Sequence, residues 1–151
     1  MSTATTPPIA ELIPHRAPMV LVDSITHWDD KNIICHSESH LSSDNPLRDQ
    51  GVLSVFAGVE YAAQAMAAHA RLISPPKADG PPRKGFLAVA SKLTATVAEL
   101  DTVAAPLVIN AHMLAHNADS SLYEFTLHAA DTLVLSGQLT AVMTEPEATP
   151  A

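Results

Sequence analysis

Glu60 is the residue whose type and position most suggest chemistry. It is the only Asp, Glu, Lys or Arg in residues 50–70, a stretch dominated by alanine. On a helix it would lie beside Phe56 and Gln64, one turn away on either side. Partial burial favours the neutral form of a carboxyl group, which suits general-acid catalysis near neutral pH. Spacing alone leaves open that Glu60 instead faces a water-filled gap or ties down a loop.

A long helix must carry this carboxyl group. From about Val52 to Ile73 there is no proline, only Gly58 interrupts the pattern, and two prolines follow at 75 and 76. Such a sequence predicts a helix of roughly six turns that ends before the prolines. Because the helix is apolar nearly all round, it must be covered on most sides.

Strand patterns flank this helix on both sides. A short helical turn is expected at Ile9–Ile13. In the last strand, Leu133–Met143, the alternate apolar residues that begin with Leu133 should lie on one face. Strands are predicted at Met19–Trp28, Asn32–His40, Phe86–Val97, Leu107–His116, Leu122–Ala129 and Leu133–Met143. One long apolar helix wrapped by a curved antiparallel sheet is an α+β architecture, the hotdog fold. We expect one domain over residues 9–143, with flexible tails at 1–8 and 144–151.

Composition narrows the classes of function. The chain has 151 residues and a formal net charge of −8, so it lacks the basic face that nucleic-acid binding needs. Its single cysteine, Cys35, rules out an intramolecular disulfide and is expected to be a packed small residue. The N-terminus does not read as a signal peptide, and Glu60 argues against a membrane span. These features favour a cytoplasmic protein.

Two motifs resemble those of a known enzyme family. Residues 12–23, Leu-Ile-Pro-His-Arg-Ala-Pro-Met-Val-Leu-Val-Asp, look like the opening of 3-hydroxyacyl-acyl-carrier-protein dehydratases. Gly51-Val52-Leu53, followed by Glu60 to Ala67, looks like the central helix of those enzymes, with a Glu and an Ala-Gln one turn later. The resemblance covers about residues 9–143 and is closest to the divergent branch associated with aryl polyenes and related pigment polyketides.

The resemblance implies a lyase that removes water from 3-hydroxyacyl thioesters. It implies a homodimer or heterodimer of hotdog domains paired edge to edge, with acyl tunnels at the interface. A histidine would remove the proton next to the thioester carbonyl, and a glutamate from the partner subunit would protonate the departing hydroxyl. A backbone N–H at the helix start, from Gly51 or a neighbour, would polarise the carbonyl. No cofactor is implied, since side chains can carry both proton transfers.

The sequence departs from the family pattern at the histidine. The family places it 14 residues before the glutamate, where this chain has Pro46, and follows it with Phe-Pro-Gly. His40, expected at the end of its strand, is the best candidate base, and Asn45 is a candidate substrate-binding residue near the expected place. Gln64 is a candidate contact for Glu60 or for a ligand.

The other histidines are expected to do less. His15 should hydrogen-bond a turn beside the site, and His36 should share a strand face with His40. His69 should lie on the opposite side of the helix from Glu60. His112, His116 and His128 are expected on solvated outer strands, and no ligand spacing favours a metal site.

Two other functions remain open. Hotdog thioesterases use an acidic residue on the same helix without a partner histidine. A non-catalytic or half-site subunit of a heteromeric dehydratase would also explain the displaced histidine. The acyl group would arrive on an acyl carrier protein or coenzyme A. An acidic carrier would need a local basic patch, for which the sequence offers Arg71, Lys77, Arg83 and Lys84, unless these are simply solvated loop charges.

Overall fold

The computed structural model describes residues 7–13, 18–73, 85–117 and 120–144. The predicted tails, apart from residues 7, 8 and 144, lie outside this part of the chain, as do His15, Lys77, Arg83 and Lys84. The elements in chain order are α1 (Ile9–Leu12), β1 (Ser24–Trp28), β2 (Asn32–Ser37), the 3₁₀ turns η1 (Ser39–Leu41) and η2 (Val55–Ala57), α2 (Gly58–Ile73), β3 (Gly85–Ala95), β4 (Leu107–His116), β5 (Ser120–Ala129) and β6 (Thr132–Thr144).

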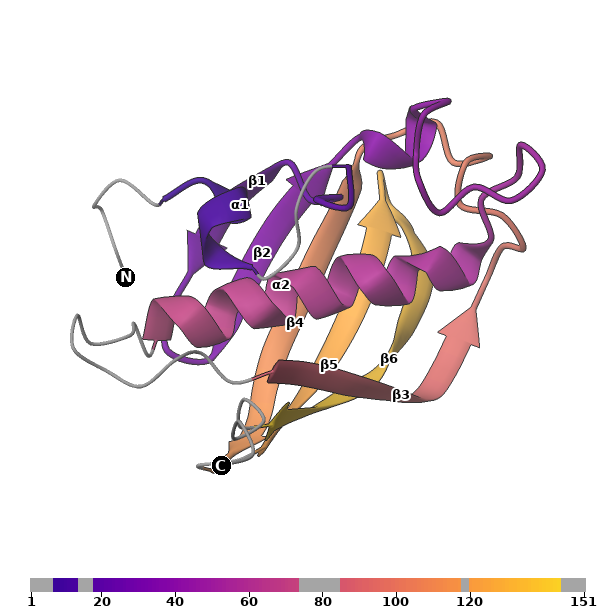
Figure 1. The fold of residues 1–151 in the computed structure, drawn as a ribbon. Coiled ribbons are helices and arrows are strands. Elements are labelled where there is room, and N and C mark those ends of the chain that lie inside the picture. The colour runs from indigo at the N-terminus through magenta and orange to yellow at the C-terminus, as the bar shows by residue number, and fades with distance from the viewer. Residues whose placement is uncertain (1–6, 14–17, 74–84, 118–119, 145–151) are drawn as a thin grey trace, which may run out of the picture.

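The strands form one antiparallel sheet in the order β1-β2-β4-β5-β6-β3. The chain leaves the sheet after β2, forms α2, and returns at the far edge as β3 (Figure 1). Strands β4, β5 and β6 pair with one another in chain order, each antiparallel to the one before it. The predicted α+β class and hotdog fold are confirmed.

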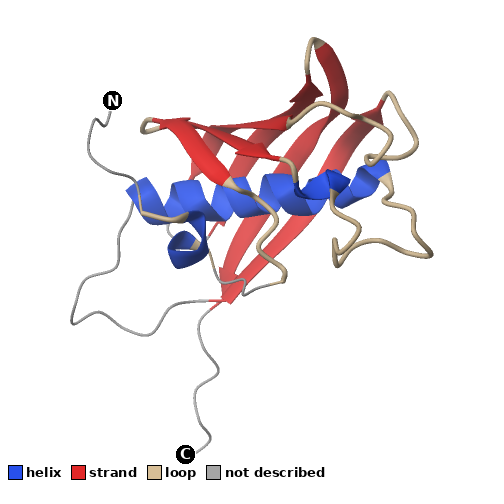
Figure 2. Ribbon diagram, turned by 90° about the horizontal axis from the view of Figure 1, so that it is seen from above, coloured by secondary structure: helices blue, strands red, loops and turns tan. Residues whose placement is uncertain are grey.

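Helix α2 lies along the sheet, which curves round it (Figures 1 and 2). Mostly apolar residues are buried at alternate positions of β2, β5 and the first half of β4, which is how a half-buried sheet forms a core. The helix is buried from Tyr61 to His69, as its apolar surface predicts. Alanine dominates this buried stretch, so sheet and helix can approach closely. Among the described residues, no helix is both long enough and apolar enough to span a membrane.

The helix begins later than predicted, at Gly58 instead of Val52. The chain before it is extended and pairs with the loop after β3: Val55 N–H donates to the Ala98 carbonyl, and Leu100 N–H donates to the Leu53 carbonyl. Ser54 then caps η2 by accepting a hydrogen bond from the N–H of Phe56. Long-range backbone pairing thus overrides the local preference for helix.

The first and last strands differ from their predictions. The first strand starts at Ser24 and not at Met19, because the backbone N–H groups of Leu21 and Val22 bond to Gln64 instead of a strand. In β6 the pairing register shifts by one residue opposite His128. This bulge leaves Leu133 36% exposed and buries Val134 fully, so Leu133 does not share the apolar face as predicted.

Candidate active site

Glu60 lies in the first turn of α2 and is half-buried. The predicted partial burial of this carboxyl group is therefore confirmed. The first turn of a helix carries unsatisfied N–H groups and positive potential, and the sequence supplies an acidic residue there. The catalytic role of Glu60 stays a prediction.

His40 lies in η1, three residues after β2 ends at Ser37, and its side chain is fully buried. The prediction that His40 ends its strand is wrong, because the chain turns after Ser37 and forms η1. Its Nε2 lies 2.9 Å from the carbonyl oxygen of Val103 and 3.0 Å from that of Ala105. A carbonyl oxygen can only accept, so Nε2 must carry the proton.

This tautomer leaves a lone pair on the other ring nitrogen of His40. Nδ1 is buried and has no hydrogen-bond partner within the described residues. Burial lowers the pKa of His40 below its usual value of 6.5, while the hydrogen bonds to Val103 and Ala105 oppose this effect. A neutral imidazole with a free lone pair is equipped to accept a proton.

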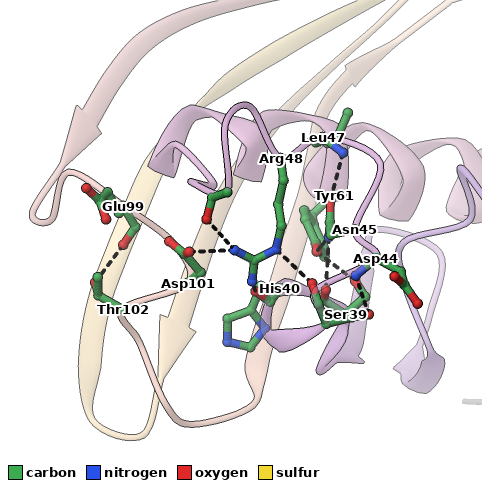
Figure 3. Close-up of polar contacts among 12 residues, drawn as sticks. Ser39, His40, Asp44, Asn45, Leu47, Arg48, Tyr61, Glu99, Asp101 and Thr102 are labelled. Atoms are coloured by element: carbon green, nitrogen blue, oxygen red, sulfur yellow. Dashed lines mark hydrogen bonds and ion pairs between the residues drawn. The ribbon is translucent and has the colours of Figure 1, made fainter.

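A buried polar cluster ties η1 to the start of α2 (Figure 3). The hydroxyl of Tyr61, next to Glu60 in the sequence, lies 2.7 Å from the Ser39 hydroxyl. Asn45 donates from Nδ2 to the Tyr61 hydroxyl at 3.0 Å and to the Ser39 carbonyl at 2.9 Å. The residues adjacent to Glu60 and His40 are thereby held against each other.

Asn45 has few groups left with which to bind a substrate. Both protons of its amide are donated within the chain, its Oδ1 accepts from the N–H of Leu47, and the residue is 6% exposed. Through these contacts Asn45 stabilises the loop between η1 and η2. They do not support its predicted role in substrate binding.

Gln64 is likewise occupied by the protein. Its Oε1 accepts from the N–H of Leu21 at 2.9 Å and of Val22 at 3.4 Å, and its Nε2 donates to the Met19 carbonyl at 2.6 Å. The side chain is fully buried. Gln64 therefore anchors the segment before β1 on α2, and these contacts do not support the predicted contact with a ligand.

Gly51 does not lie at the start of α2, so the prediction that Gly51 begins that helix is wrong. The polarisation of a carbonyl by the N–H of Gly51 or a neighbour stays a prediction. It lies in a turn closed by the pair Asp49 and Val52, with φ at +80°, a backbone conformation that favours glycine. The helix starts seven residues later, because Leu53 and Ser54 pair with the loop after β3 and the 3₁₀ turn η2 comes before Gly58.

Sequence reasoning missed Arg48, which bonds to several segments of the site at once (Figure 3). Its guanidinium donates to the carbonyls of His40, Ser42 and Gly51 and to the carboxylate of Asp101. A signal was present: Arg48 is the only Lys or Arg between residues 31 and 71. Its partners are mostly backbone carbonyls, which no sequence pattern reveals.

His69 and His36, two other histidines of the described part of the chain, belong to different elements from His40. His69 is fully buried on α2, where its Nδ1 accepts from the Tyr123 hydroxyl and its Nε2 donates to the Asp29 carbonyl. His36 is half-buried on β2, and because His40 is not on that strand the two do not share a strand face as predicted.

The three histidines of β4 and β5 are only partly as predicted. His116 is exposed, whereas His112 and His128 are half-buried. Cys35 is fully buried, and burial raises the pKa of its thiol to about 12, which makes it a packed residue as predicted. Of the predicted basic patch, only Arg71 is described, and it is half-buried at the end of α2.

Two surface hollows, of about 560 and 290 Å³, are lined by other residues. The larger lies over the face of the sheet that points away from α2, with His112 and Glu124 among its lining side chains. Neither hollow includes His40 or Glu60.

Comparison with solved structures agrees with this fold. The dehydratase heterocomplex ApeI:P from Xenorhabdus doucetiae matches with a TM-score of 0.78 at 20% identity, over 91% of each chain. AziG from S. sahachiroi matches at 0.61 and 14% identity, over 89% of this chain and 99% of that one. A mutant of the thioesterase PA1618 from Pseudomonas aeruginosa matches at 0.61 and 13% identity, over 95% and 96%.

At these identities the structural matches show the fold alone, and no curated protein matches the chain significantly. The model of a protein family, by contrast, covers nearly the whole sequence. That family is the ApeP-like group, described as ApeP dehydratase, and it matches residues 7–150. The chain belongs to the ApeP-like dehydratase family.

Proposed function

We propose that this chain removes water from 3-hydroxyacyl chains on acyl carrier protein, giving trans-2-enoyl thioesters for aryl polyene or related polyketide synthesis. Membership of a dehydratase family supports the reaction. The observation that carries the assignment of residues is His40: a buried imidazole with its proton on Nε2 and an unpartnered lone pair on Nδ1.

The proposed reaction needs one base and one acid. Nδ1 of His40 removes a proton from the carbon next to the thioester carbonyl, and the electrons of that C–H bond form the carbon–carbon double bond. The bond from the neighbouring carbon to its hydroxyl breaks. Glu60 protonates the departing oxygen, which leaves as water. The lowered pKa of His40 keeps it neutral and ready to accept a proton at neutral pH.

We further propose that the chain works beside a second hotdog subunit. The structural match to the ApeI:P heterocomplex supports this pairing, as does edge strand β3, on which Val89 is 57% and Leu93 is 37% exposed. Exposed apolar residues on an edge strand favour pairing with another chain. As in the resembled family, such a partner would form the acyl channel together with this chain and pair the glutamate of one subunit with the histidine of the other.

A second reading, a subunit that does no chemistry itself, is favoured by one observation. His40 is 0% exposed and holds two backbone carbonyls, which are also the properties of a histidine that only stabilises a loop. The two readings differ in whether the Nδ1 lone pair is needed.

The test uses the chain purified with its hotdog partner and 3-hydroxyacyl carrier protein, and mass spectrometry follows the loss of water. The key variants are Glu60→Gln and His40→Gln, because the glutamine amide can still donate to the Val103 and Ala105 carbonyls but cannot take a proton. We expect each to lower the rate by about 100-fold or more, with Glu124→Gln and His116→Gln as surface controls at the wild-type rate.

Wild-type rates in both key variants would assign the chemistry to the partner and make this chain the non-catalytic subunit. Release of free thiol without water loss would instead indicate a thioesterase.

A further inference from the structure

Arg48 bonds to both ends of the loop between η1 and η2. Its Nε donates to the Ser42 carbonyl at 2.8 Å and its Nη2 to the His40 carbonyl at 3.2 Å. Its Nη1 donates to the Gly51 carbonyl at 3.0 Å. One planar guanidinium therefore fixes the backbone that carries His40 relative to the turn that leads towards α2.

The same guanidinium also bonds to the loop that holds the imidazole ring. Nη1 lies 2.7 Å from Oδ2 of Asp101, and Asp101 is followed in this loop by Val103 and Ala105, whose carbonyls accept from Nε2 of His40. His40 is thus held at its backbone by Arg48 and at its ring by the loop that Arg48 binds.

The surroundings of this ion pair indicate a geometric role. The side chains of Arg48 and Asp101 are only 15% and 16% exposed, and removing charges from water offsets much of their attraction. Although burial opposes it, the hydrogen bond from Arg48 holds the pKa of Asp101 below its usual value. Asp101 is therefore charged at neutral pH. Arg48 contacts it through one bond, from Nη1 to Oδ2, while the same guanidinium donates to the carbonyls of His40, Ser42 and Gly51, a geometry that a lysine cannot reproduce.

We propose that Arg48 is a positioning residue: by joining the His40 backbone to the Asp101 loop, it fixes the ring orientation and tautomer of His40. This inference rests on the proposed role of His40 as base. Arg48 itself does not touch the substrate, and it acts only through the histidine.

The variants are chosen to separate positioning from folding. Arg48→Met removes the guanidinium but keeps the apolar stem, Arg48→Lys keeps the charge without the fork, and Asp101→Asn removes the carboxylate charge. Lys31→Met, in the exposed turn between β1 and β2, is the matched control for the loss of one cation. All are assayed in the complex with the partner subunit, after circular dichroism has shown that they fold.

Three readouts are measured on each variant. We expect Arg48→Met to lower kcat by about 10–100-fold with KM changed less than about threefold, and Arg48→Lys to recover only part of the loss. A double variant with Asp101→Asn should be little worse than Arg48→Met alone, because the two side chains act as one unit. Lys31→Met should match the wild type.

The second readout is the acid side of the kcat–pH profile. The charged groups that face His40 are Glu38, Asp101 and Arg48. In Arg48→Met the loosened ring gains water and the Asp101 charge loses its partner. Both changes raise the pKa of His40, so the fall in kcat on acidification should begin at higher pH. A variant that is merely less stable would keep the wild-type profile.

The third readout needs no activity. Nitrogen NMR of histidine side chains distinguishes the two ring tautomers, and the signal assigned by its loss in His40→Gln should show the Nε2–H form in the wild type and a mixture in Arg48→Met. If the wild type proves inactive, this readout still tests the positioning. An unchanged His40 signal and unchanged kcat in Arg48→Met, or in Arg48→Lys if the methionine variant does not fold, would overturn the inference.

Discussion

The side-chain oxygen of Gln64 accepts a hydrogen bond from the backbone N–H of Leu21, which lies 43 residues earlier in the chain. Gln64 also accepts from the N–H of Val22 and donates to the Met19 carbonyl. The amide of one α2 side chain thus forms hydrogen bonds with the backbone before β1 that a neighbouring strand would otherwise form. This segment is not part of a strand. Gln64 provides partners for the N–H groups of Leu21 and Val22 and for the Met19 carbonyl.

Gln64→Leu should lower the free energy of unfolding by about 2–4 kcal/mol, because it leaves buried backbone donors and an acceptor without partners. Urea unfolding followed by circular dichroism measures this loss. Gln138→Leu, half-buried on β6, is the matched control and should change stability by less than about 1 kcal/mol. Equal losses in the two variants would mean that the Gln64 bonds contribute nothing specific.

Gly58→Ala should destabilise the fold by about 1 kcal/mol, although alanine favours helix. A Cβ atom at Gly58 would lie 2.7 Å from Cδ2 of Leu127 and 2.9 Å from Cδ2 of Leu135, both fully buried. Overpacking costs about 1–3 kcal/mol, against a gain of about 1 kcal/mol in helix propensity. The cost should shrink in a Leu127→Val background, which removes one of the crowding methyl groups, and a double-mutant cycle of urea unfolding measures that coupling. A stabilised single variant would contradict this account.

Acidification from pH 7.5 to 5.5 should destabilise the protein. Burial lowers the pKa of both His40 and His69 in the folded state, so near the unfolded value of 6.5 the unfolded chain binds more protons. The free energy of unfolding then rises with pH, by up to about 1.4 kcal/mol per pH unit for each histidine. The urea midpoint measured at several pH values tests the sign.

The variant for this experiment is His69→Gln, whose amide can still donate to the Asp29 carbonyl, and it should lower the pH slope by the share of one histidine. Gln64→Leu is the control, since it lowers stability but keeps both histidines and so keeps the slope. A slope that His69→Gln leaves unchanged would remove His69 from the account.

Charges on edge strand β3 should prevent assembly with the partner subunit. We expect Val89→Lys and Leu93→Lys to shift the complex to separate chains in size-exclusion chromatography with light scattering, because solvated charges block strand pairing. Leu114→Lys is the matched control: Leu114 is 44% exposed but lies on β4, an inner strand. If the β3 variants assemble normally, the partner binds elsewhere.

The sequence predicts the elements of this fold well and their ends less well. Period-two alternation located Leu107–His116 to the residue, since each position reports its own face. The start of α2 depends on pairing with distant backbone at Ala98, and the bulge at Leu133 depends on the pairing register with His128 across the β5–β6 hairpin. Local patterns contain no record of such contacts.

The site shows the same division. Glu60 could be singled out because a lone carboxyl group in an apolar stretch is a side-chain signal. The hydrogen bonds that hold the His40 ring could not be predicted, because its partners are the backbone carbonyls of Val103 and Ala105. Every residue type has a backbone carbonyl. Asn45 and Gln64 could be recognised as polar residues near the site, but the sequence does not reveal that their amides are bonded within the protein.

The close packing of Gly58 against Leu127 and Leu135 has a consequence for biosynthesis. The ribosome synthesises α2 before β5 and β6. The apolar surface of this helix therefore stays without the strands that bury it while the rest of the chain is translated. The His40 ring also lacks its hydrogen-bond partners during this time, since they lie 63 and 65 residues downstream. The nascent chain therefore needs protection from aggregation over that interval, and a transcript truncated before β6 yields a helix with much of its cover missing.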